Sequence, residues 1–148
     1  MREIKFRAYD KHTKIMLPVV DVIKFTKSES INIMRDGAYG VGVTIPYQPS
    51  IELMQFTGLH DENGKEIYEG DIVKFKHRDK TIMAPVKYGE WQESKCDEYD
   101  CPHYGYYIDY KWDNYCENTG FDLYEKIVEV VGNIYENPEL LKGADNIE

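Results

Sequence analysis

The sequence predicts a single, mainly β domain, and three observations support this fold class. Apolar and polar residues alternate near the N-terminus and again between residues 104 and 112, which is the period of a half-buried strand. Between these stretches, Asn63-Gly64 and Gly70 give turn signals next to apolar runs. The chain has 148 residues, which suits one core and leaves little room for two domains.

The first half of the chain contains short strand-like runs separated by turns. Ile4, Phe6 and Ala8 occupy alternate positions, and a turn at 10–14 leads to a second apolar run at 15–20. Pro18 predicts that this second run is an edge strand or contains a bulge, because proline has no N–H for a sheet hydrogen bond. Further short extended runs follow at 22–25, 31–33 and 41–45, with a turn at 35–37.

The stretch 53–75 organises the predicted fold. Its two apolar runs, 51–57 and 71–75, flank a loop in which Asn63-Gly64 predicts a type I′ hairpin turn. Gly70 predicts a sharp bend before the second run, because glycine tolerates positive φ. We expect Asp71 to cap nearby backbone amides, and Ile72, Val73 and Phe75 to form a buried strand.

In the second half, an apolar run at 81–88 is interrupted by Pro85, and residues 89–102 are acidic and turn-like. β-branched residues favour a last strand over a helix at 128–134. Asn137 as N-cap, Pro138 at the first helical position and Glu139 in the first turn predict a short C-terminal helix over 137–141. The tail 142–148 is expected to be flexible.

An aromatic stripe lies on the strand predicted at 104–112. Alternate positions are occupied by Tyr104, Tyr106, Ile108, Tyr110 and Trp112. We expect this face to pack in the core, although a stacking platform for bases or a groove for a peptide would use the same pattern. Tyr107 lies on the opposite face with Asp109 and Lys111, and is therefore expected to be the exposed aromatic.

Three segments, 1–10, 53–75 and 130–141, together resemble the YopX family, whose members are proteins of phages and prophages of Gram-positive bacteria. They cover roughly a third of the chain, in the family's order and at both ends. The resemblance implies one YopX-like domain over residues 1–148, with an SH3-like barrel centred on 53–75. The residue patterns add further N-terminal strands and the short final helix to this barrel. It implies no catalytic residue. A Trp usually stands in the family where this chain has Tyr9, and the segments 20–50 and 76–120 match no family motif.

The net charge of −9 is unevenly distributed. Residues 1–88 carry 14 basic and 12 acidic side chains, whereas residues 89–125 carry 2 basic and 10 acidic ones. An acidic surface repels phosphate backbones, so we expect no direct binding of nucleic acid. The same charge would attract a basic partner, and it also has a simple explanation in solubility.

Composition also bears on location. The sequence has no apolar run of about 18 residues, so no membrane-spanning helix is expected. The charged N-terminus is unlike a signal peptide, and three cysteines do not form a disulfide framework. These features predict a protein of the cytoplasm of the bacterial host.

Candidate metal sites are weak. Cys96, Cys101, His103 and Cys116 offer zinc-type ligands, but the paired Cys-x2–4-Cys spacing of structural zinc sites is missing or at its limit. Asp61-x-Asn63-Gly64 is partly similar to a calcium loop, yet Lys65 interrupts the ligand pattern and a hairpin turn explains the segment better. We therefore expect no bound metal and no cofactor.

No Gly-x-Ser-x-Gly, Walker or Gly-x-Gly-x-x-Gly motif is present, so the sequence indicates no enzyme. The function predicted is a protein-binding module that contacts a host or phage protein, a basic one included, through Asp97, Glu98, Tyr107 and Asp109. Two alternatives remain open: an acidic mimic of nucleic acid that occupies a host DNA- or RNA-binding protein, and a small hydrolytic or metal-dependent enzyme. A homo-oligomer also remains open.

Overall fold

The computed structural model describes residues 4–20, 22–25, 31–34, 50–92, 102–110, 120–123 and 127–142, and almost all of their regular structure is β. The predicted mainly β class is thus confirmed. Two compact units follow one another along the chain, residues 1–58 and residues 59–148. The prediction that residues 1–148 form one domain concerns how these units fold, and it stays a prediction.

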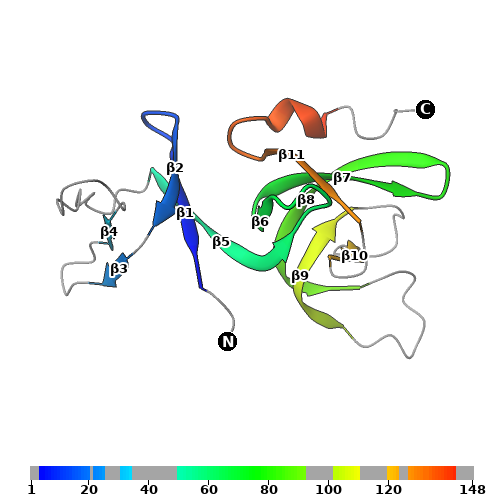
Figure 1. Ribbon diagram of the computed structural model, residues 1–148, viewed down its shortest axis with the longest axis horizontal. Coiled ribbons are helices and arrows are strands. Elements are labelled where there is room, and N and C mark those ends of the chain that lie inside the picture. Colours follow the sequence, from blue (N-terminus) through cyan, green and yellow to red (C-terminus); the bar gives the residue numbers. More distant parts are fainter. Residues whose placement is uncertain are drawn as a thin grey trace. The chain divides into compact units, whose positions relative to one another are not determined.

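The described elements can be followed in chain order in Figure 1. They are β1 (Phe6–Asp10), β2 (Ile15–Val20), β3 (Val22–Phe25), β4 (Ile31–Met34), β5 (Ile51–His60), β6 (Glu66–Tyr68), β7 (Asp71–His77), β8 (Lys80–Trp91), β9 (His103–Asp109), β10 (Gly120–Asp122), β11 (Glu129–Asn133) and the 3-10 helix η1 (Pro138–Leu141). None of the described helical residues forms a segment that is long and apolar enough to cross a membrane.

In the first unit, β1 lies between β2 and β5, and both pairings are antiparallel. β2 is the edge strand of this sheet, and its register against β1 shifts between the pairs Phe6–Val20 and Ala8–Leu17. Pro18 lies within that shift. The prediction of an edge strand or a bulge is therefore confirmed, since both are present, and the reason is that a proline at this place interrupts the fewest ladder hydrogen bonds. β3 and β4 form a separate antiparallel pair.

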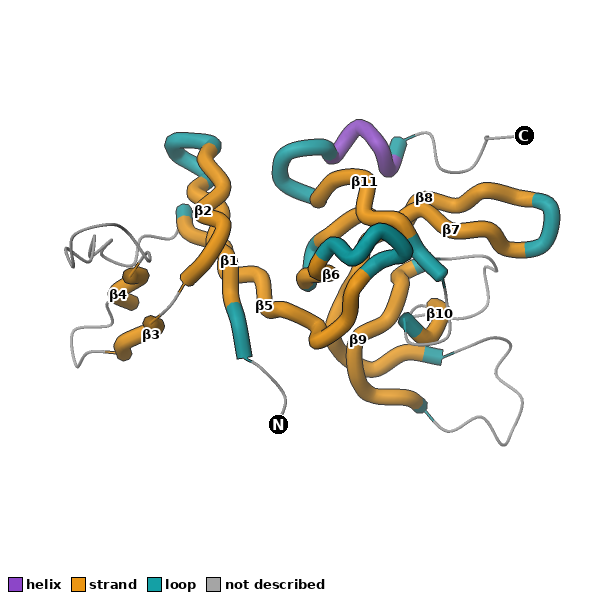
Figure 2. The backbone as a smooth tube through the Cα atoms, viewed as in Figure 1, coloured by secondary structure: helices purple, strands orange, loops and turns teal. Residues whose placement is uncertain are grey.

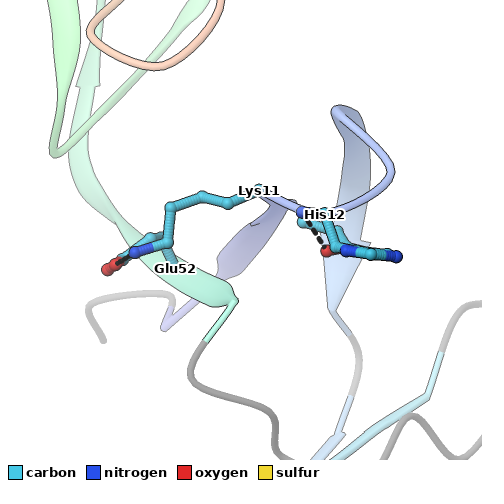
Figure 3. Close-up of polar contacts among 4 residues, drawn as sticks. Lys11, His12 and Glu52 are labelled. Atoms are coloured by element: carbon cyan, nitrogen blue, oxygen red, sulfur yellow. Dashed lines mark hydrogen bonds and ion pairs between the residues drawn. The ribbon is translucent and has the colours of Figure 1, made fainter.

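The turn between β1 and β2 is held by Asp10. Its carboxylate accepts a hydrogen bond from the His12 backbone N–H at 2.9 Å (Figure 3). It also accepts one from the Thr13 hydroxyl at 2.8 Å. These bonds, with that from Thr13 the more important, hold the pKa of Asp10 below its usual value. Beside the turn, Lys11 pairs with Glu52 of β5 at 2.6 Å; the pair is exposed, so it contributes less than about 1 kcal/mol.

The loop between β5 and β6 is closed as a hairpin, but in a different way from the one predicted. The Gly64 N–H donates to the Asp61 carbonyl at 3.0 Å, and the Asp61 N–H donates to the Lys65 carbonyl at 2.8 Å. Gly64 has φ of +81°, whereas Asn63 is not among the residues with positive φ. A type I′ turn needs positive φ at both central residues, so that assignment is wrong. The loop instead fits a turn followed by a single left-handed glycine, the arrangement of three-residue hairpin loops.

The bend predicted at Gly70-Asp71 is confirmed. Gly70 has φ of +82°, and its N–H donates to the Val86 carbonyl at 2.8 Å. The buried carboxylate of Asp71 accepts the Tyr68 N–H at 2.8 Å, which is the amide cap expected of it. Ile72, Val73 and Phe75 are then buried along β7, as predicted.

The second unit is built on a five-stranded antiparallel sheet in the order β10-β9-β8-β7-β11. The long strand β8 changes partner along its length: residues 80–85 pair with β7, and residues 86–91 pair with β9. Pro85, which lacks an N–H, is the last residue on the β7 side. The turn-like segment predicted at 89–102 therefore begins later than expected, because β8 continues to Trp91. Figure 2 shows β7 and β8 as a long hairpin closed by a short turn.

The core of the second unit is made of apolar side chains from nearly every strand. Its members are Ile67, Val73, Phe75, Ile82, Ala84, Val86, Tyr106, Ile108, Phe121, Leu123, Val128 and Val130. In the first unit, the buried cluster of the described residues contains Ala8 and Ile51, with Phe6, Leu17 and Leu53 partly buried against it.

The last strand is confirmed as β11, but the predicted C-terminal helix is not, because only the 3-10 turn η1 forms. None of its residues is buried, so no packing stabilises a longer helix. The Asn137 side chain makes no cap; its Oδ1 instead accepts the Asn133 N–H at 3.4 Å. The strand expected at 41–45, the turn at 35–37 and residues 143–148 of the tail lie outside the described residues.

Candidate functional site

Two tyrosines stand exposed on neighbouring strands of the second unit. Tyr88 of β8 is 62% exposed and Tyr104 of β9 is 73% exposed, although both are large and partly apolar. In the β8–β9 ladder, Tyr88 lies opposite Tyr106 and Glu90 lies opposite Tyr104. Cross-strand partners point to the same face of a sheet, so all four side chains share one face. We call Tyr88, Glu90 and Tyr104 the tyrosine patch.

Contacts within this face hold the patch in place. The Tyr104 hydroxyl donates to Glu90 Oε2 at 2.7 Å, and the Tyr88 ring meets the buried Tyr106 ring edge-on at 5.0 Å between centroids. The hydrogen bond to Glu90, followed by the charge of Glu90, raises the pKa of Tyr104. Both exposed rings are thus anchored at one side and open at the other.

A pair of glycines lies on the other face of the same ladder. Gly89 and Gly105 lie opposite each other, and both have φ of +153°. A Cβ at either position would meet no atom within 4 Å, so neither glycine is needed to avoid a clash. The positive φ is therefore what favours glycine at both positions.

Tyr107 is buried, at 6% exposure, so the prediction that it is the exposed aromatic is wrong. It does lie on the face predicted, opposite Lys87. That face is covered, because the Trp91 ring stacks on Tyr107 at 6.0 Å between centroids and the Tyr107 ring packs against Gly120. Burial, together with the charge of Asp109, raises the pKa of Tyr107. Tyr107 therefore serves packing, and the premise for its contact with a partner is removed.

Asp109 lies beside Tyr107 and is half-buried. Its carboxylate pairs with Lys87 Nζ at 2.5 Å. This hydrogen bond raises the pKa of Lys87, against a smaller opposing effect of burial. Asp109 thus has a partner within the chain, and a role in binding would require it to exchange that partner. Asp97 and Glu98 lie outside the described residues.

No group of three or more His, Cys, Asp or Glu side chains that could hold a metal ion occurs in the part of the chain that the structure describes. Of the four zinc candidates only His103 belongs to that part, where it stacks on Trp91 at 4.8 Å. Cys96, Cys101 and Cys116 lie outside it, so the prediction about zinc stays a prediction.

The carboxylate of Asp61 binds backbone amides. Oδ1 accepts the N–H groups of Asn63 and Lys65, both at 2.9 Å, and Oδ2 accepts the Val130 N–H at 3.0 Å. Both oxygens thus have donors, which agrees with the hairpin interpretation of this segment over the calcium loop.

Sequence reasoning missed the exposure of Tyr88 and Tyr104. Periodicity placed Tyr104 among the core residues. An alternating pattern predicts which side chains share a face of a strand, but not how far along that face neighbouring residues bury them. The available signal was the glycine that follows each tyrosine, since a glycine inside a strand indicates a bend.

Comparison with known proteins identifies a family and a similar solved structure. The model of the YopX protein family matches residues 5–142. The crystal structure of protein EF1440 from Enterococcus faecalis is similar to this chain, with 29% sequence identity and a TM-score of 0.57, over 95% of this chain and 99% of that one. No curated protein matches the sequence.

Proposed function

The chain belongs to the YopX protein family, and from this premise we propose that it is an accessory phage or prophage protein that acts by binding another protein. The observation that carries the proposal is the tyrosine patch. Tyrosine is enriched at the centres of protein interfaces, because it contributes a large apolar ring and a polar group at small entropic cost. Two exposed, anchored tyrosines on adjacent strands supply such a centre.

The partner proposed is a host or phage protein with a basic surface. Glu90 lies within the tyrosine patch, and residues 89–125 carry 10 acidic against 2 basic side chains. Tyrosine faces also attract arginine through cation–π contact. Basic side chains of a partner could therefore contact the tyrosine rings and pair with the carboxylates at the same time. The place of action proposed is the cytoplasm of the bacterial host.

The scaffold proposed for this binding is an SH3-like barrel in the second unit. Three features support it: β7 to β10 form an antiparallel meander, β8 is shared between β7 and β9, and β11 pairs with the outer side of β7. A strand shared between two pairings is the means by which a sheet curls toward closure.

The test is affinity capture from the natural bacterial host, followed by titration of the purified captured protein. The parent chain is compared with Tyr88→Ala/Tyr104→Ala. We expect the double variant to bind at least about tenfold more weakly, mainly through faster dissociation, since central aromatic residues dominate interface energetics.

The matched control is Ile127→Ala, which also truncates an exposed apolar side chain of the second unit. It should bind like the parent. Equal binding by the parent and the double variant would refute the tyrosine patch as the contact surface. Capture of a nucleic-acid-binding protein that is released by salt and is insensitive to the tyrosines would favour the acidic mimic instead.

A further inference from the structure

A hollow of about 310 Å³ opens at the closed end of the β7–β8 hairpin, the turn of which is visible in Figure 2. It lies within the second unit. Its lining residues are His77, Arg78, Asp79, Lys80, Ile82 and Tyr110. Small-molecule sites usually occupy roughly 300–1,000 Å³, so the hollow has the size of a site for one small ligand.

The inner side of the hollow is lined by aromatic rings that pack against buried aromatic core residues. Phe121, a buried core residue, packs against the His77 ring at 4.7 Å and stacks on the Tyr110 ring at 6.1 Å, with 17° between the latter two planes. Phe121 in turn packs against Phe75 of β7. Two rings that line the hollow are therefore fixed by the core, as a preformed surface for a flat ligand requires.

The rim is basic although the chain is acidic. Residues 74–80 contain four Lys or Arg and one Asp, in a chain of net charge −9. Arg78 and Lys80 are exposed, and neither forms an ion pair with the residues that the structure describes. The rim thus offers two cationic groups and the single carboxylate of Asp79.

Arg78 also has an unfavourable backbone conformation. It is the first of the two residues that connect His77 to Lys80, and its φ is +55°. This conformation costs a side-chain-bearing residue about 1–2 kcal/mol and is the one that Gly or Asn adopts in hairpin turns. The hairpin therefore contains a charged side chain where the backbone favours glycine, and this side chain lines the hollow.

We propose that this hollow binds a nucleoside phosphate. The rings of Tyr110 and His77 receive the flat base, the guanidinium of Arg78 and the ammonium of Lys80 bind the phosphate, and the Asp79 carboxylate accepts a ribose hydroxyl. A single nucleotide fits better than a nucleic-acid strand, because a longer phosphate backbone would meet the acidic side chains that dominate the rest of the sequence. This site is separate from the tyrosine patch, and it stands or falls independently of the proposed function.

The test is calorimetric titration of the full-length chain with AMP, GMP, CMP and UMP, at about 50 mM salt so that charge is little screened. Adenosine and inorganic phosphate are titrated in parallel, as probes of the ring and of the charge alone. We expect at least one nucleotide to bind about tenfold or more tightly than either probe. Arg78→Gln/Lys80→Gln should weaken that nucleotide at least about tenfold.

The matched control is Lys76→Gln, which removes one positive charge from an exposed residue of the same hairpin that does not line the hollow. It should leave the affinity unchanged within about twofold, because Lys76 does not line the hollow and therefore makes no contact with the phosphate. Tyr110→Leu, which keeps an apolar side chain on Phe121, should weaken the nucleotide but not inorganic phosphate. Circular dichroism checks that each variant is folded.

Three results would overturn the proposal. These are no binding of any nucleotide at millimolar concentration, equal affinity for the nucleotide and inorganic phosphate, and unchanged affinity in Arg78→Gln/Lys80→Gln. Tighter binding of a poly-glutamate peptide than of every nucleotide would also overturn it, in favour of an acidic protein partner. Because Arg78 and Lys80 are exposed, their variant tests the site even if Tyr110→Leu does not fold.

Discussion

At the scale of single residues, Asp61 connects parts of the second unit that are distant in sequence. Its carboxylate receives N–H groups from its own loop and from Val130 of β11. Burial by itself would raise the pKa of Asp61, but the hydrogen bonds from Val130, Lys65 and Asn63, with the charge of Lys65, hold it below the ordinary value of 3.8. The ionised form is therefore the one that stabilises the fold.

Asp61→Ala should lower the free energy of unfolding by about 2–3 kcal/mol, because three backbone donors lose a charged acceptor. Since the folded pKa lies below the unfolded one, the stabilisation by Asp61 is complete above about pH 4 and is lost as the pH falls through the folded pKa. Urea unfolding of the parent and the variant at pH 7 and pH 3 measures both effects. If the free energies of unfolding of the parent and the variant differ by the same amount at pH 7 and at pH 3, this role of the carboxylate is contradicted.

Gly64 permits a test of backbone conformation without a steric clash. A Cβ at this position would meet no atom within 4 Å, yet φ is +81°. Gly64→Ala should therefore cost about 1 kcal/mol through backbone strain, and Gly64→Asn should cost less because asparagine tolerates the left-handed region. Thermal unfolding of the two variants measures this order, and a variant with Ala as stable as the parent would show that the loop adopts another conformation.

At the scale of elements, the strands near strong local signals were predictable. Alternation and turn residues identify β1, β7 and β11 closely, since each has an apolar pattern next to a glycine, proline or aspartate with a defined backbone role. The tyrosine patch, the burial of Tyr107 and the length of β8 were not predictable in this way. They depend on pairing with β9 and on Gly120, which are distant in sequence, and tertiary contacts override local signals such as Pro85 and Gly89.

The end of β11 and the turn after it form one packed element. A Cβ added to Gly132 would come within 2.6 Å of Asn137 Oδ1 and 3.0 Å of Asn137 Cβ. Asn133 Oδ1 accepts the N–H groups of Tyr135 and Glu136, at 3.0 and 2.9 Å, and thereby fixes the turn that brings Asn137 back over Gly132.

Gly132→Ala should therefore destabilise the protein, and the loss should be smaller when Asn137 is already replaced by Gly. We expect a coupling of about 0.5–1.5 kcal/mol in the double-mutant cycle, the range typical of residues in contact. Chemical denaturation of the four proteins gives this coupling. Additive losses would mean that the side chain of Asn137 does not lie over Gly132.

At the scale of the whole molecule, charged residues are segregated by sign along the chain, whereas buried apolar residues follow a different distribution. The acidic side chains concentrate in residues 89–125, whereas residues 74–80 are basic, so one unit contains segments of opposite sign. Such segregation serves two different ligands better than one, since each field attracts its own counter-charge. The tyrosine patch and the hairpin hollow are the corresponding candidate sites.

Among the residues that the structure describes, in contrast, the larger buried core lies in the second unit. Twelve buried side chains form its cluster, whereas in the first unit the buried cluster of the described residues contains Ala8 and Ile51. Stability rises with the apolar area buried, and a short chain with a small core is marginal by itself. β5 begins in the first unit and ends in the second, with Gly58 at the boundary at φ of +88°. A fragment must therefore keep β5 intact for a fair test.

We predict that a fragment from Ile51 to the C-terminus folds by itself and unfolds in one cooperative transition, and that a fragment of residues 1–60 does not. The physical reason is that the first fragment retains every residue of the larger core, whereas the buried cluster among the described residues of the first unit has only two members, Ala8 and Ile51. Circular dichroism and calorimetry on both fragments and the full chain measure this. The full chain should then show one transition, as the prediction of a single domain requires, because residues 1–60 cannot unfold at a temperature of their own. A separate cooperative transition in the fragment 1–60 would instead establish two independent domains.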